Sequence, residues 1–546
     1  MNERIRIYDT TLRDGTQGEN ISFSAEEKLK IALRLDDLGV DYIEGGWPGS
    51  NPRDLRFFEI ARTVPLRHAR LAAFGCTRKP GGAAEADPHL AALLQSGAPV
   101  ATVFGKSWDL HVTRILETSL EENLAMIRET IAHLKRHGLE VIYDAEHFFD
   151  GYRRNPGYAL ETVQAAAEAG ADAVVLCDTN GGSLPGEIAA ALRAAAGRTG
   201  GLPLGIHTHN DCGLAVANTL AAVEAGASLV QGTINGYGER CGNADLTSVL
   251  PILALKMGRA VAADLRKLQS LSRFVSETAN VVPLHARPFV GRSAFAHKGG
   301  VHVSAVMKTP EAYEHIDPAL VGNTRRVLVS DLAGRSNIAY KARELGVPLE
   351  GKPGDARRIV EEIKQLEQEG YQFDVADGSL QILLEKLTGR FEPHFELESF
   401  RVTIEKDRDF PCQAHATVKI RVNGKQEITA AEGYGPVSAL DNALRKALGR
   451  FFPDLDTMRL TDFKVRVIDG DRGTAARVRV LIDSRDRESL WSTIGVSEDI
   501  IEASWQALAD SFQVKLARDK SDRSGQPERA AQAAPASRIP PQGEQA

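Results

Sequence analysis

A repeated unit of helix, glycine and short apolar strand most constrains how this chain can fold. In the first 260 residues a glycine that ends a helix is repeatedly followed by a β-branched run and a polar loop, as in LGVDYIEGG, SGAPVATVFG, HGLEVIYDAE, AGADAVVLCDT and AGASLVQGTING. Three further runs, IRIYDTT, ARLAAFGCT and LPLGIHTH, bring the expected strands to eight. Short apolar strands that alternate with helices form parallel sheets, and eight such units favour closure. We therefore predict a (β/α)₈ barrel over residues 1–261.

Two helix starts carry a local signal that supports this interpretation. Ser24 with Glu27, and Ser119 with Glu122, have the spacing of a capping box, in which each side chain bonds the backbone N–H of the other residue. After Ser119 an apolar stripe of helical period runs as far as Leu134. Both segments are therefore expected to be helices of the barrel's outer ring.

Polar residues follow the expected strands at one end only. They are Arg13, Asp14, Glu44, Glu146, Asp178, Thr179, His207, His209 and the run Asn235 to Asn243. Active sites of such barrels assemble from the loops at the carboxyl ends of the strands. The opposite ends begin with turn residues, so the pattern predicts one catalytic mouth.

The spacing His207-x-His209 at the end of the seventh strand is that of a metal site. Residues two apart on a strand face the same side. Asp14 ends another apolar run, Ile5 to Leu12, and would add an anionic oxygen to the two imidazoles. Arg13 beside it carries a fixed positive charge, which with a metal suits a reaction that develops negative charge on a carbonyl oxygen. Without the other motifs, two histidines on a polar strand end would be the simpler interpretation.

Composition limits the classes of partner. The 546 residues carry a formal net charge of -7, which argues against bulk binding to nucleic acid or to an anionic membrane. No apolar leader precedes the first strand, and no run of about 18 or more apolar residues occurs, so a cytoplasmic protein is expected. The five cysteines are scattered without a C-x-x-C motif and are expected to be reduced and mostly buried.

The pattern changes twice after the barrel. Residues 262–397 read as helices and loops, including the charged run DARRIVEEIKQLEQEG, and are expected to form a linker and accessory subdomains. Residues 398–518 alternate strands such as HATVKIRVNG with helices, as in an α+β domain. Residues 519–546 are rich in Pro, Ala, Gln and Ser and are expected to be disordered.

Four motifs in this order resemble a known superfamily. DTTLRDGTQ, HTHND, GYGERCGNADL and HKGGVH are similar to motifs of the metal-dependent aldol and Claisen barrels, which include isopropylmalate, homocitrate and citramalate synthases and hydroxymethylglutaryl-CoA lyase. The segment YDTTLRDGTQGENISFSAEEK resembles the citramalate synthase branch more than the isopropylmalate branch. EGYGPVSALDNAL and WSTIGVSEDIIEAS resemble the amino-acid-binding dimerisation domain of the synthases, which the lyases lack.

The resemblance implies an acyltransferase that condenses acetyl-CoA with pyruvate, hydrolyses the thioester and releases CoA and citramalate in isoleucine biosynthesis. It implies a homodimer and a divalent metal ion, with Mn²⁺ or Mg²⁺ expected and Zn²⁺ as the alternative, held by Asp14, His207, His209 and Asn243. Arg13 would polarise the keto oxygen of pyruvate, and Thr179 would bind its carboxylate. Glu146 would act as a general base or orient one, and His302, with Tyr313 nearby, would transfer protons from the accessory region of the partner subunit.

Two sets of residues are expected to set specificity and regulation. Phe104 and Asp144 lie near strand ends, where they would select a methyl keto acid, although core packing or hydrogen bonding to a neighbouring side chain fits them equally well. Gly433, Gly435 and Gly473 would let the backbone approach a small effector, for which isoleucine is the expected amino acid.

Each candidate also has a simpler role. Arg13 and Asp14 could form a surface ion pair, and Glu146 could pair with His147 or Arg153. Thr179 and Asn243 could cap the helices expected near Pro185 and Ala244, and His302 could pack against Val303. The rival activities are those of isopropylmalate or homocitrate synthase, and the rival of another class is a non-catalytic amino-acid sensor on the same fold.

Overall fold

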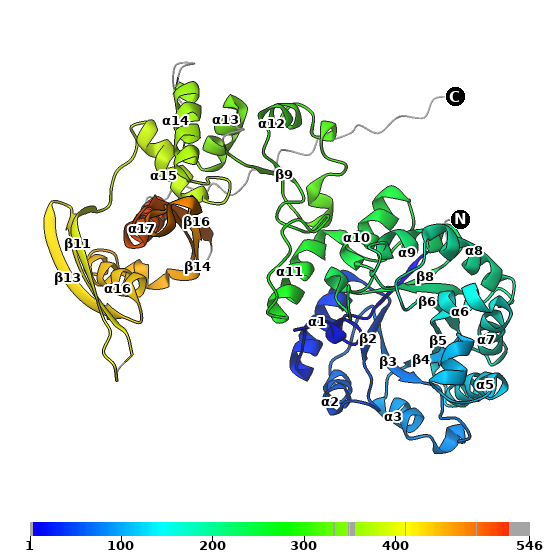
Figure 1. Cartoon of the computed structure of the whole chain (residues 1–546). Coiled ribbons are helices and arrows are strands. Elements are labelled where there is room, and N and C mark those ends of the chain that lie inside the picture. The colour runs from blue at the N-terminus through cyan, green and yellow to red at the C-terminus, as the bar shows by residue number, and fades with distance from the viewer. Residues whose placement is uncertain are drawn as a thin grey trace, which may run out of the picture. The chain divides into compact units, whose positions relative to one another are not determined.

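The eight predicted strands close into a parallel barrel in the computed structural model, which describes residues 4–330, 334–347, 349, 355–409, 411–487 and 489–523. Neighbouring strands pair in chain order, and the first pairs with the last (Figure 1). The strands are β1 (Arg6–Asp9), β2 (Tyr42–Gly46), β3 (Arg70–Cys76), β4 (Val100–Lys106), β5 (Glu140–Glu146), β6 (Ala173–Asp178), β7 (Leu204–Thr208) and β8 (Leu229–Gly232). The predicted (β/α)₈ barrel is therefore confirmed.

Helices surround the strands. They are α1 (Ala25–Leu38), α2 (Pro52–Ala61), α3 (Pro88–Ser96), α4 (Asp109–Arg114), α5 (Leu120–Arg136), α6 (Phe148–Arg154), α7 (Pro156–Glu168), α8 (Pro185–Ala196), α9 (Ala215–Glu224), α10 (Leu246–Pro251) and α11 (Leu268–Thr278). The capping box of Ser24 and Glu27 is present at α1. At α5 only half of the predicted box forms: the Ser119 hydroxyl accepts from the backbone N–H of Glu122, whereas the Glu122 carboxylate binds Arg78. A buried guanidinium is a stronger partner than a backbone N–H, so this carboxylate points away from the cap.

Two buried layers hold the barrel together. The lumen is filled by Tyr8, Tyr42, Ala72, Val100, Ile142, Ala173, Val175, Cys177 and Leu229. A larger apolar layer lies between the outer face of the strands and the helices, with Ile7, Phe57 and Leu176 among its fully buried members. Because the lumen is packed, a ligand can be held only where the strands end.

The accessory region is mostly helical, as predicted. It contains β9 (Ala296–His297), α12 (Gly300–Val306), β10 (Arg326–Val327), α13 (Arg335–Glu344), α14 (Asp355–Glu369) and α15 (Asp377–Leu387). The helices α13, α14 and α15 share one apolar core that includes Ile338, Ile363 and Leu384. Short helical turns elsewhere are η1 (Gly15–Gln17), η2 (Ala84–Ala86), η3 (Ile234–Gly236), η4 (Ile252–Lys256), η5 (Leu265–Lys267), η6 (Pro310–Ala312), η7 (Pro318–Val321), η8 (Pro453–Thr457) and η9 (Gly470–Ala475).

The C-terminal α+β region contains two copies of one motif, in which three antiparallel strands are followed by a helix. The first copy is β11 (Glu396–Glu405), β12 (Gln413–Val422), β13 (Lys425–Gly433) and α16 (Pro436–Leu448). The second is β14 (Arg459–Val467), β15 (Val478–Arg485), β16 (Leu490–Ser497) and α17 (Ile500–Arg523). Alternate residues of β12 are buried, as expected for a sheet covered on one face.

The chain divides into two compact units, each described by itself. The first comprises Met1–Phe295 with Ile316–Arg325, and the second Ala296–His315 with Arg326–Ala546. The domain boundaries expected near residues 261 and 397 stay predictions. Helix α17 extends through Arg523, beyond the expected start of the tail at residue 519, and residues 524–546 lie outside the described part of the chain.

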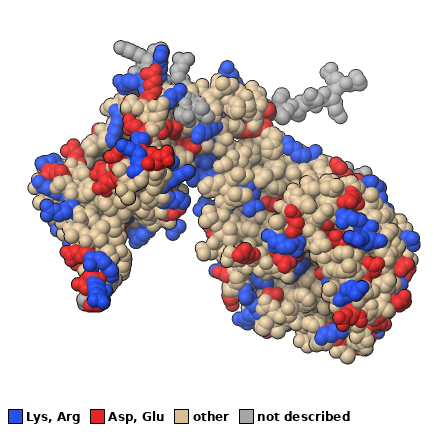
Figure 2. All heavy atoms as spheres, viewed as in Figure 1, with Lys and Arg blue, Asp and Glu red and all other residues tan. Residues whose placement is uncertain are grey.

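The surface and the cysteines add two observations. On the barrel face seen in Figure 2, basic and acidic side chains are interspersed. Within the described residues, no helix is long and apolar enough to cross a membrane. All five cysteines are free, but Cys212, Cys241 and Cys412 are exposed, so the expectation of mostly buried thiols is wrong. The first two lie in polar loops at the barrel mouth, where no apolar layer covers them.

Candidate metal centre and active site

Two histidines and an aspartate meet at the carboxyl ends of β1 and β7. His207 lies in β7 and His209 directly after it, and their Nε2 atoms are 3.2 Å apart. The Asp14 Oδ2 lies 3.7 Å from the His207 Nε2, and all three side chains are buried. One ligand atom of each lies within 4.8 Å of the others, so these residues could hold a metal ion. Two nitrogens bound to one ion at about 2.1 Å would lie about 3–3.5 Å apart, which is the separation seen.

The protonation states suit metal binding. Burial lowers the pKa of His207 to about 4 and also lowers the pKa of His209, so both imidazoles are neutral near pH 7. Burial acts to raise the pKa of Asp14, but Arg13 and the two histidines hold that pKa well below its usual range. Metal ligands must be deprotonated, and all three are.

Asn243 lies against this group through a single antiparallel bridge between His209 and Asn243. Its Nδ2 donates to the Asp14 Oδ1 and to the Tyr237 carbonyl, each at 3.0 Å. Its Oδ1 is buried and has no hydrogen-bond partner among the described residues. An orphaned buried oxygen beside three metal-competent groups fits a fourth ligand. The alternative cap role is wrong, because α10 begins at Leu246 and its N-cap is Asp245.

Gln231, a residue that the sequence analysis missed, fixes the orientation of His207. Its Oε1 lies 2.9 Å from the His207 Nδ1, and its Nε2 donates to the Asp144 Oδ1 at 3.0 Å. The amide oxygen is an acceptor, so the His207 Nδ1 carries the proton and the Nε2 is left bare. Asp144 thus has a hydrogen-bonding role toward the metal group. The available signal was a glutamine in the otherwise apolar strand LVQG.

Only 11% of the Arg13 side chain is exposed, so the surface-pair alternative is wrong. Its Nη1 donates to the Asp14 Oδ2 at 3.0 Å and its Nε to the Glu44 Oε2 at 2.6 Å. Glu44 also accepts from the Tyr8 hydroxyl at 2.8 Å. These bonds fix the guanidinium beside Asp14. The sequence pattern marks Glu44 as a strand-end carboxylate, but it does not show that Glu44 pairs with Arg13.

Aromatic rings lie beside Arg13. The Arg13 guanidinium carbon is 3.7 Å from the Phe74 ring centroid. Phe74 and Phe104 stack at 5.4 Å, and Trp47 meets both edge-on at 5.7 Å. This cluster of Trp47, Phe74 and Phe104 forms an apolar wall next to the guanidinium.

Glu146 and Thr179 end neighbouring strands. The Glu146 carboxylate pairs with Lys106, its register partner on β4, and not with His147 or Arg153. The Thr179 hydroxyl accepts from the His147 backbone N–H at 2.9 Å, so its own hydrogen is available to another acceptor. Thr179 does not cap α8, whose N-cap is Leu184.

His302 and Tyr313 lie in the second compact unit. Their rings stack with centroids 4.3 Å apart, and both side chains are exposed. Val303 is buried, whereas His302 is exposed. The three glycines expected in regulation differ: a Cβ on Gly433 would lie 2.3 Å from the Ala439 backbone nitrogen, whereas one on Gly435 or Gly473 would meet nothing within 4 Å. Close approach at Gly433 is made by the chain's own helix α16.

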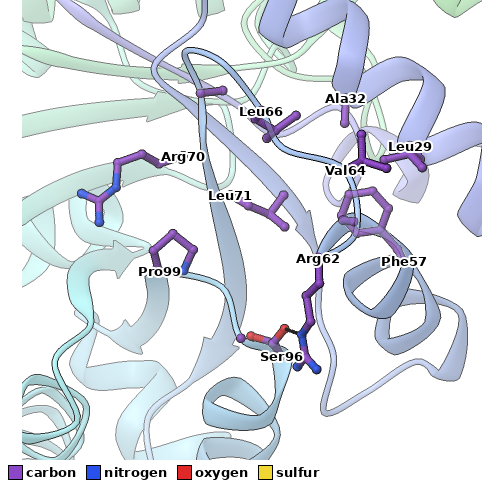
Figure 3. A pocket seen from close by; sticks show the side chains of 13 residues that line it. Leu29, Ala32, Phe57, Arg62, Val64, Leu66, Arg70, Leu71, Ser96 and Pro99 are labelled. Atoms are coloured by element: carbon purple, nitrogen blue, oxygen red, sulfur yellow. Dashed lines mark hydrogen bonds between the residues drawn. The ribbon is translucent and has the colours of Figure 1, made fainter.

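An apolar hollow opens elsewhere on the barrel (Figure 3). It is lined by residues of α1, α2 and the segments that enter β3 and β4, such as Leu29, Phe57 and Leu71. The Arg62 Nε donates to the Ser96 carbonyl at 3.0 Å on its rim. These residues lie at the amino ends of the strands, so the hollow is separate from the metal group.

Comparison with known proteins agrees with this architecture. A model of HMGL-like proteins matches residues 4–275, a homocitrate synthase post-HMGL domain-like model matches 289–371, and a model of the LeuA allosteric (dimerisation) domain matches 374–516. The (R)-citramalate synthase of Aquifex aeolicus is 52% identical over 96% of this chain and 99% of its own length. That of Geobacter sulfurreducens is 53% identical over 94% and 97%. The chain belongs to the (R)-citramalate synthase family. A probable 2-isopropylmalate synthase of Methanopyrus kandleri is less similar to this family member, at 35% identity over 96% of the chain and 100% of its own length.

Proposed function

We propose that the protein is a cytoplasmic enzyme of isoleucine biosynthesis that condenses acetyl-CoA with pyruvate and hydrolyses the thioester, giving (R)-citramalate and CoA. Identity above 50% to proteins of that name over nearly the whole chain carries this proposal. The buried group of Asp14, His207 and His209 supports it independently, because it suits chemistry on a keto acid.

The metal group would be completed by Asn243. Two imidazoles and two oxygen donors suit Mn²⁺ or Mg²⁺, with Zn²⁺ as the alternative. When bound, the ion would supply Lewis acidity at the keto oxygen.

Arg13 and Thr179 would bind and orient pyruvate. The Arg13 guanidinium is fixed by Asp14 and Glu44, so it can stabilise negative charge on the keto oxygen without rearranging during the reaction. The Thr179 hydroxyl hydrogen would go to the pyruvate carboxylate, because His147 already occupies its acceptor side. Together these groups would fix the ketone for attack by carbon.

Glu146, His302 and Tyr313 would handle protons. Removal of a proton from the acetyl methyl group gives the enolate carbon that attacks the ketone, and a later proton transfer activates the water that cleaves the thioester. Glu146 would accept or orient one of these protons, with Lys106 holding its carboxylate. His302, stacked on Tyr313, would carry the other from the accessory region of the partner subunit in a homodimer.

Phe104 would restrict the acceptor to a methyl keto acid. It forms the wall beside Arg13 with Phe74 and Trp47, so a longer 2-oxo acid would meet aromatic rings. Asp144 would contribute through Gln231 at the base of the same site.

The C-terminal domain would bind isoleucine near Gly433, Gly435 and Gly473. The match of residues 374–516 to an allosteric and dimerisation domain supports both an effector site and a homodimer. Equilibrium dialysis with isoleucine tests the effector. Binding that survives deletion of residues 398–518 would place the effector elsewhere.

The decisive test of the activity is CoA release with a panel of keto acids. We expect pyruvate to give the highest kcat/KM and chiral chromatography to identify (R)-citramalate. Preference for 2-oxoisovalerate or 2-oxoglutarate would indicate isopropylmalate or homocitrate synthase instead. No turnover with any of them, combined with amino-acid binding, would indicate the non-catalytic sensor.

A further inference from the structure

Arg240 lies where three loops of the barrel mouth meet. It belongs to the loop after β8, and its guanidinium donates from Nε and Nη2 to the two carboxylate oxygens of Asp211, at 2.8 and 3.0 Å. The same Nη2 donates to the backbone carbonyl of Thr179 at 2.7 Å. Asp211 follows β7, and Thr179 follows β6. One side chain therefore connects the loops after β6, β7 and β8.

The backbone of the β8 loop is shaped to present this side chain. Arg240 has φ 56°, a left-handed conformation that non-glycine residues rarely adopt. The turn is closed by the Gly242 N–H, which donates to the Glu239 carbonyl at 3.0 Å. A side chain at Gly242 would strain the turn, because this glycine has φ 85° and a Cβ there would lie 2.0 Å from the Gly236 carbonyl oxygen. Strain of this kind persists only where surrounding contacts hold it.

The loops after β7 and β8, which Arg240 connects, also carry the metal-group residues His209 and Asn243. The Asn210 N–H donates to the Gly242 carbonyl at 2.9 Å, next to the bridge between His209 and Asn243. Asp211 and Arg240 lie next to these backbone contacts in the two loops. Their ion pair adds a side-chain contact between the same two loops. Without it, the relative placement of His209 and Asn243 would depend on the backbone bonds and on the Asn243 side-chain bonds to Asp14 and the Tyr237 carbonyl.

Arg240 also helps to fix the position of Thr179. Arg240 binds its carbonyl and the His147 N–H binds its hydroxyl, so both polar ends of the residue are fixed. The Arg240 guanidinium thus contacts both Thr179, which is expected to bind the keto acid, and the loop that follows His209.

We propose that Arg240 is a positioning residue that holds the His209 and Asn243 loops in metal-binding register and holds Thr179 toward the keto acid. The Thr179 part rests on the proposed function, whereas the metal part does not. Arginine is required because a planar fork with several donors reaches two carboxylate oxygens and a carbonyl at once, which one ammonium nitrogen cannot do.

The chain offers a matched control. Arg266 binds Asp264 with the same two-bond geometry, at 2.9 and 3.0 Å, on the surface of the same compact unit and away from the mouth. A general effect of losing an arginine and aspartate pair would therefore appear in R266A as well as in R240A.

The experiment compares R240A, R240K and R266A with the wild type. Calorimetric titration of chelator-stripped protein with Mn²⁺ gives the affinity, and steady-state kinetics give kcat and KM for pyruvate. We expect R240A and R240K to bind Mn²⁺ about 10–100-fold more weakly, as for other residues that orient metal ligands. We also expect a KM for pyruvate raised by a larger factor than kcat falls, and R266A within twofold of wild type in all three values.

Wild-type Mn²⁺ affinity in R240A would overturn the proposal, and wild-type affinity in R240K would overturn the requirement for a fork. If R240A does not fold, D211N tests the same contact at nearly constant volume, and unchanged Mn²⁺ affinity there would also overturn it. Mn²⁺ binding needs no turnover, so it tests the role of Arg240 even if no keto acid is a substrate. A wrong assignment of Arg240 can therefore be distinguished from a wrong assignment of the activity.

Discussion

Replacing Gln231 with leucine should weaken metal binding without any change to a ligand. The fully buried Gln231 bridges the His207 Nδ1 and the Asp144 Oδ1. Leucine removes the acceptor that keeps the proton on Nδ1, so the bare Nε2 is no longer favoured. Loss of such a partner lowers metal affinity about 10–100-fold, which corresponds to about 1.4–2.8 kcal/mol. The two buried polar groups that lose their partner should also lower the free energy of unfolding by about 1–3 kcal/mol each.

The assay is calorimetric titration of stripped Q231L with Mn²⁺, with urea unfolding of the metal-free protein beside it. Q231E keeps an acceptor for His207 and should bind Mn²⁺ more tightly than Q231L. Burial raises the pKa of Asp144 well above its usual value, which favours the protonated form that would donate to the new carboxylate. The control is Q164L, since Gln164 forms surface hydrogen bonds with Glu168 and Arg198 and lies away from the metal group. Equal Mn²⁺ affinity in Q231L and wild type would refute the orienting role.

Two further predictions concern specificity and pH. F104A should raise kcat/KM for 2-oxobutyrate relative to pyruvate by about tenfold or more, because one methylene in an apolar pocket is worth about 1–3 kcal/mol. An unchanged ratio of the two kcat/KM values in the keto-acid panel would exclude Phe104 from the acceptor pocket. Burial raises the pKa of Asp510 to about 6, against about 3.9 in an unfolded chain, and outweighs the hydrogen bond from the Ser379 hydroxyl, which acts to lower it. The native state therefore binds the extra proton, and the stability that this proton contributes is present below pH 4 and lost as pH rises through 6. D510N should flatten the decrease in unfolding free energy between pH 4 and 7 in urea titrations, and a decrease as steep as in wild type would contradict the assignment.

The barrel could be predicted because its signals are local. A glycine after a helix and a β-branched run after that glycine recur at five of the eight strands, as a repeating strand and helix unit predicts. The ligand set could be predicted for the same reason: His207 and His209 are two apart, and Asp14 follows a strand of the same kind.

The contacts between strands could not be predicted because they depend on register. Lys106 and Glu146 are paired partners in β4 and β5, so Glu146 binds a residue 40 positions away and not its sequence neighbours. Gln231 and Asp144 are 87 residues apart, and only closure of the barrel brings them together. The full capping box predicted at Ser119 was wrong for the same reason, because Arg78, distant in the sequence, binds the Glu122 carboxylate.

We expect condensation of acetyl-CoA with pyruvate to require one divalent ion held by Asp14, His207 and His209. The most direct measurement is the rate of CoA release, followed by chromatography, from chelator-stripped protein before and after stepwise addition of Mn²⁺. We expect a negligible rate in the stripped protein and full recovery at one equivalent of Mn²⁺ per chain, with no recovery at that ratio in H209A. An undiminished rate from stripped protein that contains no residual metal would contradict it.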